Sequence, residues 1–86
     1  MNEFCKAVIE FLQAEYKDGY EFNLVVHKEG TESCEMELLV KVSTCFTIKI
    51  GSKAMLYLFS IYKHGQVNPE KQHWWQEYLV SMIEGN

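Results

Sequence analysis

The stretch "CEMELLVKVSTCFTIKI", residues 34–50, decides the fold of this chain. Apolar side chains recur at every second position on both sides of its short "ST" turn, which is the period of a β-strand with one buried face. The predicted inward row consists of Cys34, Met36, Leu38, Val40 and Val42 in one strand and Phe46, Ile48 and Ile50 in the next. Because so short a turn joins antiparallel neighbours, the stretch predicts a β-hairpin.

The residues before this hairpin predict another strand and a helix. Residues 20–27 alternate in the same way, and the turn "KEGTES" separates them from the hairpin. Their predicted inward side chains are Tyr20, Phe22, Leu24 and Val26, which makes the sheet a three-stranded antiparallel meander. Residues 2–16 have an apolar side at helical spacing, formed by Phe4, Cys5, Val8, Phe11, Leu12 and Tyr16. Gly19 is a suitable left-handed stop after this helix.

The residues after the hairpin predict two helices. Ser52 is the expected N-cap of the first, which should run to His64 and stop at Gly65. Asn68 and Pro69 are the expected N-cap and first helical residue of the last helix. The predicted core stripe of that helix is Trp75, Tyr78, Leu79, Met82 and Ile83. Trp74 lies about 100° away from its neighbour Trp75, at the edge of this stripe.

The expected fold is therefore α+β, in the order αβββαα, as a single domain over residues 1–86. No apolar run approaches the roughly 20 residues that span a bilayer, and charged residues interrupt the N-terminal turns where a signal peptide would be apolar. The 3 cysteines are odd in number and have no CxxC spacing, which favours reduced thiols. We expect a cytoplasmic protein that does not associate with membranes.

The charge pattern restricts the kind of partner. There are 12 acidic residues and 8 basic ones, for a net charge of -4, and every basic residue is a lysine. Without arginine, bidentate contacts to phosphate or guanine are absent, so we expect no direct binding of nucleic acid. No nucleophile paired with a base and no phosphate-binding glycine loop is recognisable, so we do not expect an enzyme.

Acidic residues form the clearest candidate binding site. Glu29, Glu32, Glu35 and Glu37 lie within nine residues on the first hairpin loop and the outward side of the second strand. Such a surface suits a basic partner protein, although a solvated face is the alternative interpretation. Trp74 is a second candidate contact, since edge tryptophans either cover a core or bind partners.

Cysteine and histidine side chains give a candidate metal site. The predicted topology brings Cys5, His27 and Cys34 to one end of the sheet, and Cys5 and Cys34 are the candidate zinc ligands. Strand parity opposes this site, because Cys34 is expected to point inward and His27 outward. Buried thiols are the alternative, and no cofactor is required.

An acidic single domain with this order of elements resembles the small phage-encoded anti-CRISPR proteins that inhibit the RNA-guided nuclease of type II systems. The resemblance is one of architecture and composition, and it runs from "FCKAVIEFL" through "CEMELLVKV" and "CFTIKI" to "WWQEYLVSMI". It implies an acidic surface that occupies a basic cleft and blocks loading of target DNA in the bacterial host. The four clustered glutamates would then mimic DNA. Two alternatives stay open, an immunity protein against a basic nuclease toxin and a small zinc-binding regulatory module.

Overall fold

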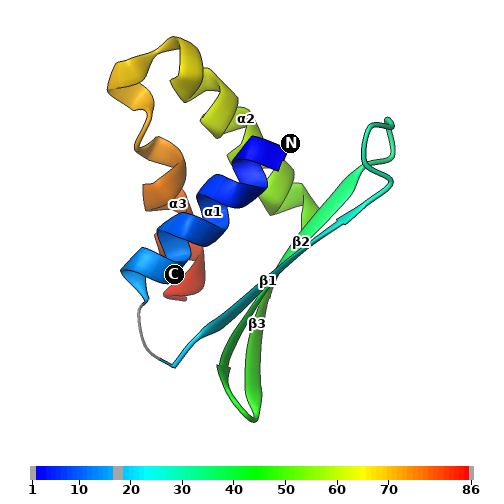
Figure 1. Cartoon of the computed structure of the whole chain (residues 1–86), viewed down its shortest axis with the longest axis vertical. Coiled ribbons are helices and arrows are strands. Elements are labelled where there is room, and N and C mark those ends of the chain that lie inside the picture. Colours follow the sequence, from blue (N-terminus) through cyan, green and yellow to red (C-terminus); the bar gives the residue numbers. More distant parts are fainter. Residues whose placement is uncertain (1, 17–18, 86) are drawn as a thin grey trace.

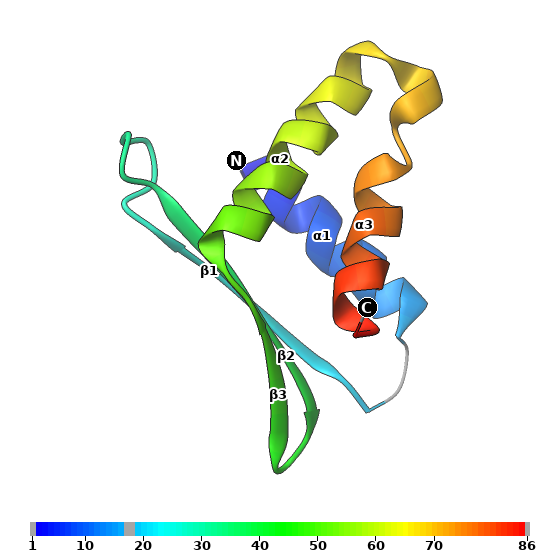
Figure 2. The same ribbon diagram turned by 180° about the vertical axis from the view of Figure 1, so that it is seen from behind.

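A computed structural model describes residues 2–16 and 19–85. The elements are α1 (Asn2–Glu15), β1 (Glu21–His27), β2 (Glu35–Ser43), β3 (Phe46–Ile50), α2 (Ser52–Val67), the 3-10 turn η1 (Pro69–Lys71) and α3 (Trp74–Ile83). This confirms the αβββαα order. The three helices lie together over one face of the sheet and leave the other face bare (Figures 1 and 2). No helix among the described residues is long and apolar enough to cross a membrane.

The sheet has the order β1-β2-β3, so β2 is its central strand. Both pairings are antiparallel, and Leu38 lies opposite Leu24 of β1 and Ile50 of β3. The alternation predicted for β2 is confirmed, since Met36, Leu38 and Val40 are fully buried. The even-numbered residues of all three strands therefore form the side on which the helices pack.

Aromatic rings connect the three helices to one another. Phe4, on the buried stripe of α1, lies 5.2 Å from the ring of Phe59 and 5.2 Å from that of Tyr62, both on α2. Trp75 of α3 contacts the same group, with its ring 6.1 Å from Phe4 and 5.5 Å from Phe11. Trp75 is thus the core tryptophan, as the sequence predicts.

The ends of α2 differ from the predicted ones. Gly51 is the N-cap, and the hydroxyl of Ser52 instead accepts a hydrogen bond from the Met36 N–H at 3.1 Å. At the other end, Gly65 does not stop the helix, which continues to Val67. Gly65 is buried because the chain after α2 turns back and packs against it: a Cβ atom there would lie 2.9 Å from the Cα atom of Gln72. The glycine therefore allows the backbone of Gln72 to approach α2 closely, and it does not end the helix.

The last helix starts later than the sequence predicts. Asn68 and Pro69 begin the short turn η1, whereas α3 starts at Trp74 after His73. A proline fixes a helical φ at one position, which a 3-10 turn satisfies as well as an α-helix.

Two side chains assigned to the core are largely exposed. Tyr78 is 46% exposed, because the buried stripe of α3 runs through Trp75, Leu79 and Ile83 and leaves it on the flank. Phe46 is 56% exposed, since the β2–β3 hairpin extends past the helices (Figure 1) and the register shifts between Lys41 and Ser43.

Two adjacent leucines of β2 test the parity of the sheet. Leu38→Ala should lower the free energy of unfolding by about 2 to 5 kcal/mol, because it leaves a cavity at a fully buried site. Leu39→Ala removes the same atoms from the half-buried outer face and should cost much less. Chemical denaturation of both variants is the measurement, and equal losses would contradict the assignment of faces.

Gly65→Ala tests the contact between α2 and the returning chain. In an exposed helix this change would be favourable by roughly 1 kcal/mol. Here it should lower the melting temperature, because the added methyl group meets the backbone of Gln72 and Lys71. Ser60→Ala, at an exposed position of the same helix, is the control and should be neutral or slightly stabilising. A stabilised Gly65→Ala variant would show that the contact is absent in solution.

Candidate functional site

The turn between β1 and β2 carries the most prominent charged feature of the surface. This hairpin projects away from the helices at one side of the molecule (Figures 1 and 2). Glu29 and Glu32 lie on its turn and Glu35 is the first residue of β2, and all three are exposed. We call these three residues the acidic tip.

Hydrogen bonds order the turn that bears the acidic tip. The Thr31 hydroxyl donates to the carbonyl oxygen of Lys28 at 2.7 Å and accepts from the Ser33 N–H at 3.2 Å. The Cys34 N–H donates to the carbonyl oxygen of Thr31 at 3.3 Å. Lys28 and Gly30 both have positive φ, which this tight course of the chain requires. The carboxylates therefore project from a defined turn.

Lysines partly neutralise the rest of the outer sheet face. Glu37 forms an ion pair with Lys49 at 3.3 Å, and Glu21 forms one with Lys41 at 3.6 Å. Such exposed pairs contribute little to stability, but they remove net charge from the middle of the face. Within the described part of the chain, no ion pair involves a glutamate of the acidic tip. Of the four clustered glutamates, Glu37 is thus the one that the structure separates from the others.

Trp74 is not brought together with the glutamates. It is 45% exposed at the start of α3, and the Lys71 ammonium lies 5.0 Å from the centre of its ring. In both Figure 1 and Figure 2 the start of α3 and the β1–β2 turn are on opposite sides of the molecule. One flat partner surface cannot reach both.

Two tyrosines that the sequence did not single out as contacts lie on the neighbouring helices α2 and α3. Tyr57 of α2 is 54% exposed and meets Tyr78 of α3 edge to face at 5.9 Å. A hollow of about 720 Å³ beside Tyr57 is lined by Lys53, Ala54, Leu56, Tyr57, Ser60 and Met82. In the sequence, Tyr57 lies off the main apolar stripe of α2, and this position could have indicated that its side chain is exposed. Exposed aromatic side chains of this kind are frequent in protein interfaces.

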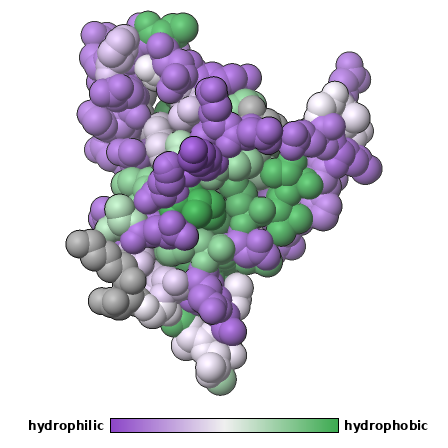
Figure 3. Space-filling model, viewed as in Figure 1, coloured by the Kyte–Doolittle hydropathy of each residue, from purple (hydrophilic) through white to green (hydrophobic). Residues whose placement is uncertain are grey.

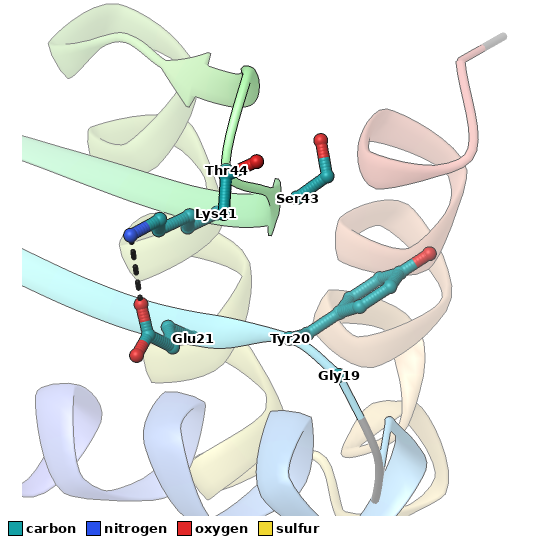
Figure 4. A pocket seen from close by; sticks show the side chains of 6 residues that line it. All are labelled: Gly19, Tyr20, Glu21, Lys41, Ser43 and Thr44. Atoms are coloured by element: carbon teal, nitrogen blue, oxygen red, sulfur yellow. Dashed lines mark ion pairs between the residues drawn. The ribbon is translucent and has the colours of Figure 1, made fainter.

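A second hollow, of about 390 Å³, lies at the opposite end of the sheet from the acidic tip and is lined by Gly19, Tyr20, Glu21, Lys41, Ser43 and Thr44 (Figure 4). It offers hydroxyl groups and the Glu21–Lys41 ion pair. Nearby, Tyr16 stacks on Tyr20 at 5.1 Å and donates a hydrogen bond to Glu84 at 2.9 Å. Burial is the largest cause, and this hydrogen bond to a carboxylate the second, of a rise in the pKa of Tyr16 to about 12. The hydroxyl therefore keeps its proton at neutral pH.

Both predicted cysteine ligands are half-buried free thiols. Burial raises the pKa of the Cys5 thiol. His27 is exposed on the outer face opposite Glu35, as strand parity predicts. Among the residues that the structure describes, no three His, Cys, Asp or Glu side chains gather as a metal site. Zinc at Cys5 and Cys34 stays a prediction.

Comparison with protein-family models, curated proteins and solved structures found no match to this chain. Its function has to be inferred from the surfaces described above.

Alkylation of the thiols tests the assignment of the cysteines. Cys45, exposed on the β2–β3 turn, should react with iodoacetamide before Cys5, because burial keeps Cys5 in the unreactive thiol form. Mass spectrometry over time at pH 8 is the measurement. Added zinc that protects Cys5 and Cys34, with protection lost in Cys34→Ser, would establish the metal site. Identical rates with zinc and with a chelator would leave both residues as plain thiols.

Proposed function

We propose that this chain is a small acidic inhibitor that binds a basic, nucleic-acid-handling protein through the acidic tip. The observation that carries the proposal is the placement of three exposed carboxylates on an ordered turn that projects from the domain. A projecting turn enters a cleft that a flat sheet face cannot enter. Inside such a cleft, the carboxylates would meet the cationic side chains that otherwise hold phosphates.

The electrostatics of the chain support the same proposal. A net charge of -4 attracts a basic cleft at long range, which raises association rates at low salt. Glu21 and Glu37 are ion-paired, whereas among the described residues the three glutamates of the acidic tip form no ion pair and outnumber Lys28, the lysine on the same turn. The turn is also ordered by Thr31, so little conformational entropy would be lost on binding.

The partner class follows from the resemblance in architecture and composition. We take it to be the RNA-guided nuclease of type II CRISPR systems, in which the inhibitor would block loading of target DNA. A basic nuclease toxin would be bound by the same surface, so the tip variants below apply to either partner.

Charge reversal distinguishes the effect of the acidic tip on binding from the effect of the net charge of the chain. The variant Glu29→Lys, Glu32→Lys, Glu35→Lys should lose most of the competition with target DNA for the guide-loaded nuclease. The control Glu10→Lys, Glu15→Lys, Glu70→Lys changes the net charge equally at exposed helical positions and should retain most of it. For the parent protein, the association rate should fall as salt rises.

Two outcomes would contradict this mechanism. The first is equal loss in the tip variant and in its control, which would reduce the effect to net charge. The second is full competition by the tip variant, which would make the tip a solubilising feature. Trp74→Ala, on the far side of the molecule, should leave tip-mediated competition unchanged.

A further inference from the structure

The two edges of the sheet are protected to different degrees. The edge strand β3 has five residues, includes Lys49, and starts beside the register shift between Lys41 and Ser43. Short length, lysine and irregular pairing are the usual means by which edge strands avoid pairing with another chain. The other edge strand, β1, has seven residues in unbroken register with β2 and includes neither lysine nor proline. In the described part of the chain, no backbone hydrogen bond links β1 to a group outside the sheet.

Apolar side chains of α1 lie beside this open edge. The buried stripe of α1 is Phe4, Val8 and Leu12, and on one flank of it Phe11 contacts Trp75 of α3. Cys5 and Ile9 are one turn apart on the opposite flank, and β1 is the strand on which α1 packs most. Both are half-buried, as are Leu24 and Val26 of β1. Figure 3 shows hydrophobic surface gathered in the middle of this view, where α1 approaches the sheet.

We propose that β1 is a docking edge, to which an extended segment of the partner adds as a fourth strand of the sheet. Alternate side chains of the added strand would point toward α1, next to Leu24, Val26 and Ile9, and should be apolar. The others would point to the outer side, where the acidic tip lies at one end of β1, and should be basic. The inference rests on the proposed function only in taking the partner to be basic.

A second copy of this chain fits the edge less well. α1 packs over β1 more than over the other strands. A two-fold pairing of β1 with itself would set the two α1 helices over adjacent strands on the same face. Adjacent strands are about 4.8 Å apart, whereas packed helices need about 8 to 10 Å. The net charge of -4 on each copy adds repulsion. A segment without its own covering helix avoids both problems.

Synthetic peptides test this edge without any nuclease, so failure here and failure of the proposed inhibition are distinguishable. The probe is acetyl-KVKVKVK-amide, and EVEVEVE is its charge-reversed control. Binding of the basic peptide should slow amide hydrogen exchange in β1 and leave β3 unchanged. Of its two alternately N-methylated forms, one should bind about tenfold more weakly, because only one set of amides faces β1.

Two lysine substitutions distinguish binding at the edge of β1 from a general effect of added positive charge on peptide binding. Val25→Lys places a lysine on the outer side of β1 and should weaken peptide binding about tenfold. Thr47→Lys adds the same charge to the outer side of β3 and should leave binding nearly unchanged. Exchange protection at β3 or α2–α3 instead, equal binding of both N-methylated forms, tighter binding of EVEVEVE, or dimerisation in sedimentation experiments would each overturn the proposal.

Discussion

Burial of the inward row of β2 is the interaction on which the rest of the structure depends. Met36, Leu38 and Val40 are fully buried beneath the helices, and Met55 and Leu58 are the buried apolar side chains of α2, the helix that packs most on this strand. The hydrogen bond from the Met36 N–H to the Ser52 hydroxyl ties β2 to the first residue of α2. Because β2 is central, its register fixes both neighbours, and with them the bare outer face, the two edges and the projecting turn.

Aromatic rings join the helices to one another more than they join them to β1, and this makes the domain asymmetric. Phe4, Phe11, Tyr62 and Trp75 fasten α1 to α2 and α3. The ring contacts of β1 involve Phe22 near its start, which lies 6.1 Å from Tyr16 and 6.3 Å from Tyr20. The rest of the strand is held by its ladder with β2 and by half-buried apolar side chains. Strong helix packing and a weakly covered edge strand are thus two results of the same arrangement.

Much of the fold was predictable because it depends on local periodicity. Strand parity identified Met36, Leu38 and Val40, and helical spacing separated Trp75 from Trp74. The predictions fail where contacts between distant residues outweigh local preference. Gly65 does not end α2 but allows the backbone of Gln72 to approach it, and Phe46 is exposed because its hairpin extends beyond the helices. The acidic cluster was visible in the sequence. The separation of Glu37 from the other three glutamates was not visible, because the ion pair between Glu37 and Lys49 depends on the register between β2 and β3.

Because the core lies on one side of a small sheet, the residues that stabilise the fold differ from those of the proposed binding tip. The acidic tip contributes no side chain to the buried core, so selection can change its charge without loss of the fold. The edge of β1 is different, because Leu24 and Val26 pack against the core while remaining half-exposed. An added strand would complete their burial, so binding there would also stabilise the domain. By mass action the gain is about 2.7 kcal/mol when the free partner is at 100 times its dissociation constant, a large share of the stability of a domain of this size.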